Sequence, residues 1–306
     1  MDTSKPLVSV FIVTYNSSDY IIEALESVRN QTYQNIELVV SDDCSSDDTI
    51  TKVREWIDQN KDRFIRTEVV ETPVNTGIPA NYNRAVRACK GEWLKMMDGD
   101  DLILPNCIED NVKYVLKNPN AHIVFSNMYL FKGKNRDKVE GKNFNSRRRL
   151  FFEKDAKSQM ICLLKGNILP SQTCFILASI LKDNCYDERY RLLEDYPMWL
   201  KLSQMGERFF YFDDCTAMYR ISDSVSSSKK NLYSVSYMDV CKQHYIDIVL
   251  PLIKQNNASE AYNQNQRKYM MYNVCLSVLK NRRNFLTIPF YWLFRVFIFN
   301  FCYFRL

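Results

Sequence analysis

Residues 7–14 read LVSVFIVT, a nearly unbroken run of β-branched and apolar side chains. Such a run is typical of a strand that is buried on both faces, as in a parallel sheet covered by helices. Residues 17–19, SSD, offer helix caps, and the apolar side chains over 20–28 recur at helical spacing. The pattern that decides the fold is therefore a buried strand followed by a crossover helix.

The same alternation continues along the chain. Further strands are predicted at 36–41, 66–71, 92–97 and 123–131, and the helices between them at 47–57, 75–89 (with a loop) and 105–116. This order predicts an α/β fold with a mainly parallel sheet flanked by helices. Ligands of such sheets bind in the crevice beyond the carboxyl ends of the strands, which is where functional residues are expected.

The second half of the chain suggests a change of architecture. Residues 132–149, KGKNRDKVEGKNFNSRRR, form a polar, basic break that is either a solvated loop or a mobile element closing over a phosphorylated ligand. A second α/β stretch covers 151–221, and beyond Ser222 the pattern is helical. We therefore expect an α/β domain at 1–228 and a helical C-terminal extension at 229–306.

Composition narrows the class of protein. The 306 residues are 46% hydrophobic and 25% charged, with a net charge of +5, which is ordinary for a globular protein and gives no sign of nucleic-acid binding. Ten cysteines stand singly, without the CxxC spacing of a zinc site, so free thiols in a reducing compartment are expected. The first residues lack the pattern of a secretion signal, which predicts a cytoplasmic protein. Neither a GxGxxG nor a GxxxxGK[ST] motif occurs, which argues against a dehydrogenase or a P-loop kinase.

The stretch WLKMMDGDD, residues 93–101, is the most informative for chemistry. A predicted strand delivers Asp98, Asp100 and Asp101 at its carboxyl end, separated only by a glycine that is expected to permit an unusual turn. Carboxylates this close repel one another and favour a cation, and oxygen ligands favour Mg²⁺ or Mn²⁺ over zinc. The alternative is an acidic turn that caps the following helix.

Two further polar segments follow predicted strands. Thr14, Tyr15 and Asn16 supply a hydroxyl, an aromatic face and an amide after the first strand, and residues 42–47, DDCSSD, follow the second. A carboxylate there can accept a hydrogen bond from the imide N–H of uracil while Tyr15 stacks on the ring. Each segment alone is a common turn. Together with the acidic strand end they outline one crevice for a base, a diphosphate and a metal.

The blocks SVFIVTYN, SVRNQTYQNIELVVSDDCSSDDT and NTGIPANYNRAVRACKGEWLKMMDGDD resemble family 2 glycosyltransferases of the GT-A fold in order and spacing. The resemblance implies an inverting enzyme that uses nucleotide-sugar donors, usually UDP-linked, and a divalent cation. By position, Asp43 matches the family's uracil-binding aspartate. Asp98 and Asp100 match the first and last carboxylates of its DxD motif, with Asp100 as the direct metal ligand.

A second matching motif is LEDYPMWL, residues 193–200, which resembles the family's ED motif and implies that Asp195 is the catalytic base. Pro197 suits a first helical turn, so Asp195 is expected at a helix N-terminus, where the helix dipole favours its ionised form. An ionised carboxylate can accept the proton of the attacking hydroxyl. Glu194 is expected to support it.

The chain also departs from the family pattern. Ser222 stands where many relatives have a metal-binding histidine after a Tyr-Arg pair, so either the metal is bound more weakly or Asp223 or water takes that place. Arg220 is expected to pair either with a phosphate or with a structural carboxylate. Asn81 and Asn83 occupy the stretch where many relatives carry an arginine facing the nucleotide, and Asn81 is assigned to the nucleotide site.

The most apolar stretch, residues 285–306, follows a basic cluster at 280–283. Arg295 lies in its middle, which disfavours a membrane span, and the aromatic content favours a helix lying in the membrane interface. Spanning the bilayer and packing against the catalytic domain or a second subunit are the alternatives. Interfacial attachment would place the protein at the cytoplasmic face of the membrane, with a lipid-linked saccharide as acceptor.

The leading hypothesis is thus a metal-dependent hexosyltransferase that acts on a glycan or lipid-linked saccharide in surface-polysaccharide assembly. A non-catalytic nucleotide-sugar-binding or assembly partner is the runner-up, although it would not need a metal carboxylate and a base together. A nucleotidyltransferase would require a glycine- and lysine-rich loop after the first strand, and residues 15–19, YNSSD, do not supply one.

Overall fold

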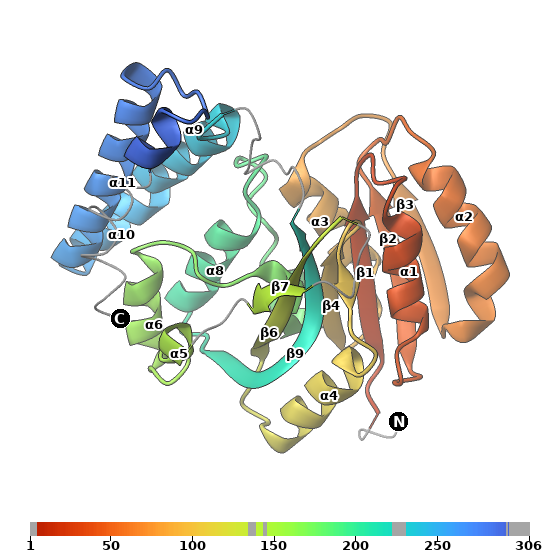
Figure 1. Ribbon diagram of the computed structural model, residues 1–306. Coiled ribbons are helices and arrows are strands. Elements are labelled where there is room, and N and C mark those ends of the chain that lie inside the picture. The colour runs from red at the N-terminus through yellow and green to blue at the C-terminus, as the bar shows by residue number, and fades with distance from the viewer. Residues whose placement is uncertain (1–4, 134–138, 143–145, 222–230, 292, 294–306) are drawn as a thin grey trace.

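The computed structural model describes residues 5–133, 139–142, 146–221, 231–291 and 293. Within them the strands form a curled sheet in the order β3-β2-β1-β4-β8-β6-β9-β5, and β7 pairs with β6 (Figure 1). The strands are β1 Val8–Thr14, β2 Ile36–Asp42, β3 Arg66–Glu71, β4 Trp93–Asp98, β5 Leu102–Ile103, β6 Ile123–Lys132, β7 Val139–Lys142, β8 Phe175–Leu177 and β9 Phe209–Ile221.

The first half of the sheet is parallel. Strands β1, β2, β3 and β4 run in the same direction, so their carboxyl ends meet at one edge. In the second half, β8 pairs antiparallel with both β4 and β6, whereas β9 runs parallel to β6. The predicted α/β fold is confirmed, and its parallel character is concentrated in the half that carries the predicted nucleotide site.

Helices cover both faces of the sheet. They are α1 Ile21–Arg29, α2 Thr49–Asn60, α3 Ile78–Ala88, α4 Cys107–Lys117, α5 Ser146–Arg149, α6 Ala156–Leu163, α7 Ala178–Asp183, α8 Asp195–Gln204, α9 Val235–His244, α10 Leu250–Gln255 and α11 Ser259–Ser277, with short turns η1 Lys61–Arg63, η2 Ser171–Thr173 and the π-helical η3 Tyr245–Val249. Side chains of α1, α2 and α4 form the core on one face, and those of α3, α6, α7 and α8 form it on the other.

Alternation along β1 explains the two cores. Val10 and Ile12 pack into the core beneath α1 and α2, while Phe11 and Val13 pack into the core beneath α3. All seven residues of β1 are buried, as expected for a strand enclosed on both faces. The strand is therefore a rigid support for the residues that follow it.

The helices α9, α10 and α11 lie together beside the sheet, at the end remote from α1 and α2 (Figure 1). Buried residues of these helices, among them Met238, Leu252 and Tyr269, belong to the same apolar core as α3 and α8. The predicted helical character beyond 228 is thus present in the described residues. The predicted boundary near Ser228 falls outside them and stays a prediction.

Several elements differ from the sequence-based prediction. The short strands β5 and β8 were not predicted because two or three residues give no periodic signal. The basic break at 132–149 contains β7 and α5 in its described part.

Among the residues that the structure describes, no helix has the length and apolar character required to cross a bilayer.

Candidate active site

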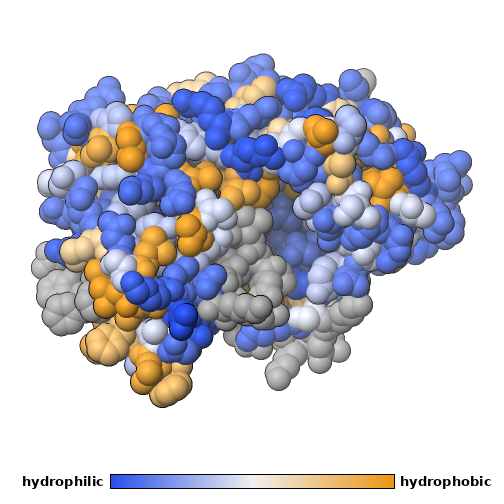
Figure 2. All heavy atoms as spheres, turned by 90° about the horizontal axis from the view of Figure 1, so that it is seen from above, coloured by the Kyte–Doolittle hydropathy of each residue, from blue (hydrophilic) through white to orange (hydrophobic). Residues whose placement is uncertain are grey.

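A cleft of about 1060 Å³ opens at the carboxyl ends of β1, β2 and β4. Figure 2 looks down on this side of the molecule and shows a hydrophilic hollow near its middle. The predicted site residues that line the cleft are Thr14, Tyr15, Asn16, Asp43, Asn81, Asp98, Asp100, Glu194, Asp195 and Arg220. Segments that are 180 residues apart in sequence therefore meet at one edge of the sheet.

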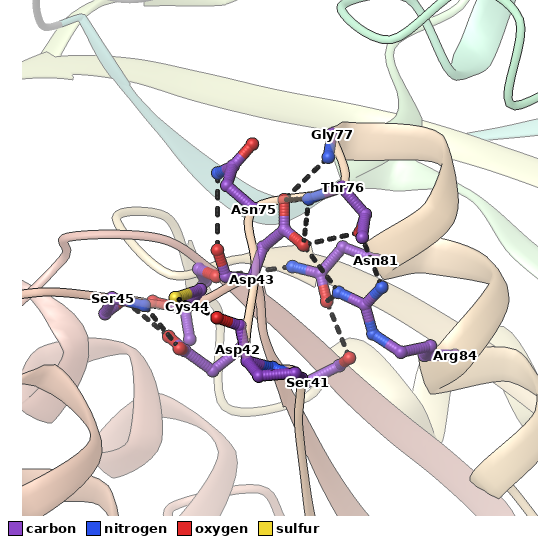
Figure 3. A network of polar contacts seen from close by, with 12 residues as sticks. Ser41, Asp42, Asp43, Cys44, Ser45, Asn75, Thr76, Gly77, Asn81 and Arg84 are labelled. Atoms are coloured by element: carbon purple, nitrogen blue, oxygen red, sulfur yellow. Dashed lines mark hydrogen bonds and ion pairs between the residues drawn. The ribbon is translucent and has the colours of Figure 1, made fainter.

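Asp43 lies at the centre of a polar network after β2 (Figure 3). Its carboxylate accepts hydrogen bonds from Thr76 N at 3.0 Å, Thr76 Oγ1 at 2.7 Å, Gly77 N at 2.8 Å and Arg84 Nη2 at 2.7 Å. Burial alone raises the pKa of Asp43, but the hydrogen bonds from Thr76, Arg84 and Gly77 outweigh it and lower the pKa. The carboxylate is therefore held ionised, and it fixes the loop that precedes α3.

Arg84 was not identified from the sequence. It lies on α3, three residues after Asn81, and it pairs with Asp43 and also contacts Asn81 Oδ1 at 3.2 Å. The sequence has asparagines at 81 and 83, where an arginine was expected, and Arg84 directly follows them. A helical phase argument could have found it, because Asn81 and Arg84 are three residues apart and so share a face.

The loops after β1 and β2 are tied together. Asn16 Oδ1 accepts from Ser46 N at 2.9 Å, and Asn16 adopts a positive φ of 50°. Asn81 Nδ2 donates to Thr14 O at 3.2 Å, and its Oδ1 accepts from Ser41 Oγ at 2.6 Å. Tyr15 remains 50% exposed at the cleft, so its ring is free to meet a planar ligand. Asn16 and Asn81 shape the cleft, and Tyr15 faces it.

Two side chains hold the first carboxylate of the acidic turn after β4. Asp98 Oδ1 accepts from Tyr82 Oη at 2.8 Å, and Asp98 Oδ2 accepts from Gln172 Nε2 at 3.0 Å. Burial raises the pKa of Asp98, and these two hydrogen bonds oppose the rise. Gly99 does not adopt a positive φ. A Cβ there would lie 2.9 Å from Thr14 Oγ1, so the glycine is required by the close approach of two strand ends.

Asp101 points away from solvent. It is 2% exposed, its Oδ1 accepts from Arg220 N at 2.8 Å, and its Oδ2 has no hydrogen-bond partner within the described structure. Burial and then the charges of Asp100 and Asp98 raise its pKa well above the usual range. A cation beside this turn would relieve the repulsion between the three carboxyl groups.

The residues present fit a Mg²⁺ or Mn²⁺ ion that is shared with a ligand. No cluster of three or more His, Cys, Asp or Glu side chains in the described part of the chain could hold a metal alone. Magnesium is usually bound through one or two carboxylates plus substrate phosphates. Asp100 and Asp98 at the cleft supply that number, and the buried Asp101 Oδ2 beside them has no hydrogen-bond partner within the described structure.

Arg220 stabilises the acidic turn by hydrogen bonds to Asp100 and Asp101. Its side chain has no exposed area, donates from Nε to Asp100 O at 2.7 Å, pairs with Glu23 at 3.0 Å and contacts Gly133 O. The guanidinium lies between the rings of Tyr20 and Phe131, with 4.4 Å and 4.5 Å to their centroids. The pairing with a structural carboxylate that was considered for Arg220 is therefore present, with Glu23 as the partner, and the pairing with a phosphate stays a prediction.

Replacement of Arg220 by methionine is expected to lower the free energy of unfolding by about 3–5 kcal/mol, because Glu23 loses a buried partner. Arg54→Met is the matched control, since Arg54 pairs with Glu71 at an exposed position, where such pairs contribute at most about 1 kcal/mol. Urea unfolding followed by circular dichroism measures both. Equal changes in the two variants would contradict the structural role of Arg220.

Asp195 begins α8, as the ED motif predicts, and Pro197 stands in the first turn. Its carboxylate accepts from Tyr196 N at 2.6 Å and from Asn167 Nδ2 at 2.7 Å. Burial is the largest influence and raises the pKa of Asp195 to about 6, so it outweighs the helix N-terminus that was expected to favour ionisation. Burial and the charges of Asp195 and Asp98 raise the pKa of Glu194 well above its usual range.

Ser222 and Asp223, the positions that replace the expected histidine, lie outside the described residues. The remaining predicted groups share one cleft: a base-binding candidate at Asp43, an acidic turn at Asp98 and Asp100, and a carboxylate with a pKa near neutrality at Asp195. Such a raised pKa suits proton acceptance near neutral pH.

Residues 9–177 match the model of the family described as glycosyl transferase family 2. Among curated proteins, the chain is 24% identical over 283 residues to the putative glycosyltransferase EpsE of Bacillus subtilis (88% of this chain, 96% of EpsE). It is 27% identical to the putative teichuronic acid biosynthesis glycosyltransferase TuaG of the same organism (75% of this chain, 85% of TuaG).

Solved structures resemble the whole architecture. Residues 1–349 of S. aureus TarS, in complex with UDP-GlcNAc, superpose with a TM-score of 0.63 at 18% identity, covering 95% of this chain and 80% of that one. The mannosyltransferase PcManGT from Pyrobaculum calidifontis, in complex with GDP-Man and Mn²⁺, gives a TM-score of 0.63 at 17% identity, covering 98% and 85%. At these identities the likeness concerns the fold.

Proposed function

Since this chain is a member of glycosyl transferase family 2, we propose that it transfers a hexosyl group from a UDP-sugar to an acceptor hydroxyl with inversion at the anomeric carbon. The observation that supports this function is the convergence of Asp43, the Asp98–Asp100 turn and Asp195 on one cleft. A binding protein without turnover would not require Asp195, whose raised pKa suits a base.

The donor is proposed from the chemistry of the cleft and from similar structures. Tyr15 offers an exposed ring beside the loop of Asp43, which is the arrangement expected for a uracil. The carboxylate of Asp43 already accepts hydrogen bonds from Thr76, Gly77 and Arg84, so an imide N–H would have to share or displace one of these donors. The similar TarS structure holds UDP-GlcNAc, which supports a UDP-linked donor.

We assign a separate role to each carboxylate from its position in the cleft. Asp195, ionised, accepts the proton of the acceptor hydroxyl as its oxygen attacks the anomeric carbon and the bond to the leaving diphosphate breaks. Asn167 and Tyr196 N hold the carboxylate in place through their hydrogen bonds. Asp100 and Asp98 would hold a Mn²⁺ or Mg²⁺ ion, which when bound supplies positive charge to neutralise the departing diphosphate. Mn²⁺ in the similar PcManGT structure supports this assignment.

The transfer rate is expected to fall as the pH drops through about 6, because Asp195 must be ionised to act as a base and its pKa is raised to about 6. Well below that pH, each further unit should lower kcat/KM about tenfold. Asn167→Ala removes a hydrogen bond that lowers this pKa, so the inflection should move to higher pH. A flat profile down to pH 4.5 in the native protein would contradict the assignment.

The function is tested by donor hydrolysis. The purified chain is incubated with a panel of UDP-sugars and MnCl₂, and the release of UDP is measured with and without EDTA. We expect release from at least one UDP-sugar that stops when EDTA is added. Release that is unaffected by EDTA would contradict metal dependence, and no release from any nucleotide sugar would contradict the proposed activity.

The acceptor is proposed to be a growing glycan or a lipid-linked saccharide in surface-polysaccharide assembly. Two similar proteins, EpsE and TuaG, are putative glycosyltransferases, and TuaG is assigned to teichuronic acid biosynthesis. Exposed apolar side chains follow the basic residues at 280–283 in the described part of the tail: Phe285 at 81%, Leu286 at 64%, Phe290 at 58% and Leu293 at 66% exposure. This combination supports peripheral attachment at the cytoplasmic face of a membrane.

Truncation after Asn284 is expected to release the protein from vesicles that contain anionic lipids. Flotation of the native and truncated chains with phosphatidylglycerol vesicles measures the bound fraction, and neutral phosphatidylcholine vesicles are the control for the contribution of the basic residues. Equal flotation of the two chains would contradict attachment through the tail.

A further inference from the structure

A set of uncharged residues also lines the cleft. Its members are Asn167, Ile168, Leu169, Pro170, Leu192, Leu193 and Tyr237. All except Tyr237 come from the segments around η2 and before α8. Tyr237 comes from α9, and within the described residues it is the one member of the C-terminal helices that lines the cleft. The C-terminal helices therefore contribute an aromatic wall to the proposed active site.

Tyr237 belongs to the Asp195 end of the cleft. Burial is the largest influence that raises its pKa, followed by Cys241, to which its hydroxyl is hydrogen-bonded, and by the carboxylates of Asp195 and Glu194. Tyr219, which also lines the cleft, is influenced by burial and then by Asp101, Asp98 and Asp100. The two tyrosines thus lie near different groups, one near the proposed base and the other near the acidic turn.

Aromatic contacts anchor α9 beside Asp195. The buried ring of His244, at the end of α9, packs edge-on against Tyr190 and Tyr196, with 5.0 Å between the centroids in each case. Tyr196 directly follows Asp195 in α8. In addition, Tyr190 Oη donates to Asp247 Oδ2 at 3.2 Å. Since α8 and α9 are fixed to each other, the distance between the base and Tyr237 is set by the fold.

We propose that Tyr237 forms the acceptor subsite and packs its ring against a sugar ring of the acceptor, a proposal that rests on the transferase function above. The acceptor hydroxyl must reach Asp195 to lose its proton, so the acceptor sugar has to lie against the walls next to that carboxylate. Those walls are uncharged, which suits a neutral saccharide. The aromatic side chain offers an apolar face for the C–H groups of the sugar ring, while its hydroxyl is hydrogen-bonded to the Cys241 side chain.

This placement gives the C-terminal helices a function in specificity. The nucleotide end of the cleft is built from the parallel strands β1, β2 and β4, whereas the far wall comes from a helix that is remote in sequence. Changes in α9 are therefore expected to alter the choice of acceptor and to leave the choice of nucleotide to the strand ends.

The test uses the full chain, Mn²⁺, the UDP-sugar that it hydrolyses and a panel of neutral p-nitrophenyl glycosides as acceptors. UDP release and the glycosylated product are both measured for the native protein, Tyr237→Leu and Tyr237→Phe. Leucine retains apolar bulk against the core but lacks a flat ring, and phenylalanine retains the ring. Tyr262→Ala is the matched control, since Tyr262 is an exposed tyrosine of α11 that does not line the cleft.

In Tyr237→Leu we expect the ratio of transfer to hydrolysis to fall at least tenfold, with KM for the glycoside rising more than KM for the UDP-sugar. Tyr237→Phe should retain most of the native ratio, and Tyr262→Ala all of it.

An unchanged ratio in a folded Tyr237→Leu protein overturns the proposal, as does a native protein that hydrolyses UDP-sugar but glycosylates none of the glycosides. Absence of UDP release from the native protein would instead overturn the transferase function itself. If Tyr237→Leu does not fold, Tyr237→Phe provides the test, because it retains the ring. A fall of tenfold or more in its ratio of transfer to hydrolysis contradicts stacking.

Discussion

Asp195→Asn is expected to reduce sugar transfer by about 100- to 10,000-fold, the range that a positioned general base contributes. An amide has nearly the shape of the carboxylate and can still accept from Tyr196 N, but it cannot take up the proton of the acceptor hydroxyl. Binding of UDP-sugar should persist, because the nucleotide groups lie at the strand ends. Transfer kinetics and calorimetric titration with UDP separate the two effects.

Glu194→Gln is the matched control for this prediction. Glu194 precedes Asp195, and burial and neighbouring carboxylates raise its pKa well above the usual range. Glutamine keeps the shape of the glutamate side chain, and because Glu194 is not the proposed base, the loss of transfer should be much smaller than in Asp195→Asn. A native rate in Asp195→Asn, or an equal loss in both variants, would refute the assignment of the base.

The second large effect is expected for Asp100→Ala. Asp100 is exposed to the cleft at the end of the acidic turn, and its removal takes away the proposed direct ligand of the metal. Loss of a charge-stabilising group at a reaction centre typically costs about 100- to 1,000-fold in rate. Titration of UDP with and without MnCl₂ should show that the native affinity depends on Mn²⁺ and that the affinity of the variant does not.

Asp48→Ala provides the comparison for Asp100→Ala. Asp48 is an exposed aspartate just before α2, outside the set of residues that line the cleft. Its removal changes the net charge by the same amount, so the Mn²⁺ response of UDP binding should remain native. A full Mn²⁺ response in Asp100→Ala would show that the metal is held elsewhere.

Local sequence patterns predicted the parallel strands beside the cleft and the polar residues that follow them. Buried parallel strands have continuous apolar runs, so β1, β2 and β4 and the polar residues at their carboxyl ends were identifiable, among them Asp43 and Asp98. The ED motif likewise placed Asp195 at the start of α8. The positions of these residues were predictable because each motif directly follows, or begins, the element that supports it; their roles stay predictions.

The partners of these residues could not be predicted in the same way. Gln172, which donates to Asp98, and Tyr237 come from distant segments, and their positions follow from the packing of the mixed half of the sheet. Strand β9 alternates between buried and exposed stretches along its length, so its sequence lacks a single strand period. Tertiary contacts of this kind leave no local signal in one sequence.

The role of Arg220 illustrates the same limit. From the sequence, a phosphate and a structural carboxylate were equally suitable partners for its guanidinium. The structure buries it between Tyr20 and Phe131 and joins it to Glu23, on a helix two hundred residues earlier in the chain. Only the fold brings these groups together, and it gives Arg220 contacts that support the acidic turn.

The central claim is that one cleft holds a uridine diphosphate and a divalent metal between Asp43 and Asp100. A crystal structure of the chain with UDP and Mn²⁺ tests it most directly. The expected result is density for the uracil between Tyr15 and Asp43, and for a manganese ion that joins Asp100 to the diphosphate. An empty acidic turn, with any bound base remote from Asp43, would contradict the claim.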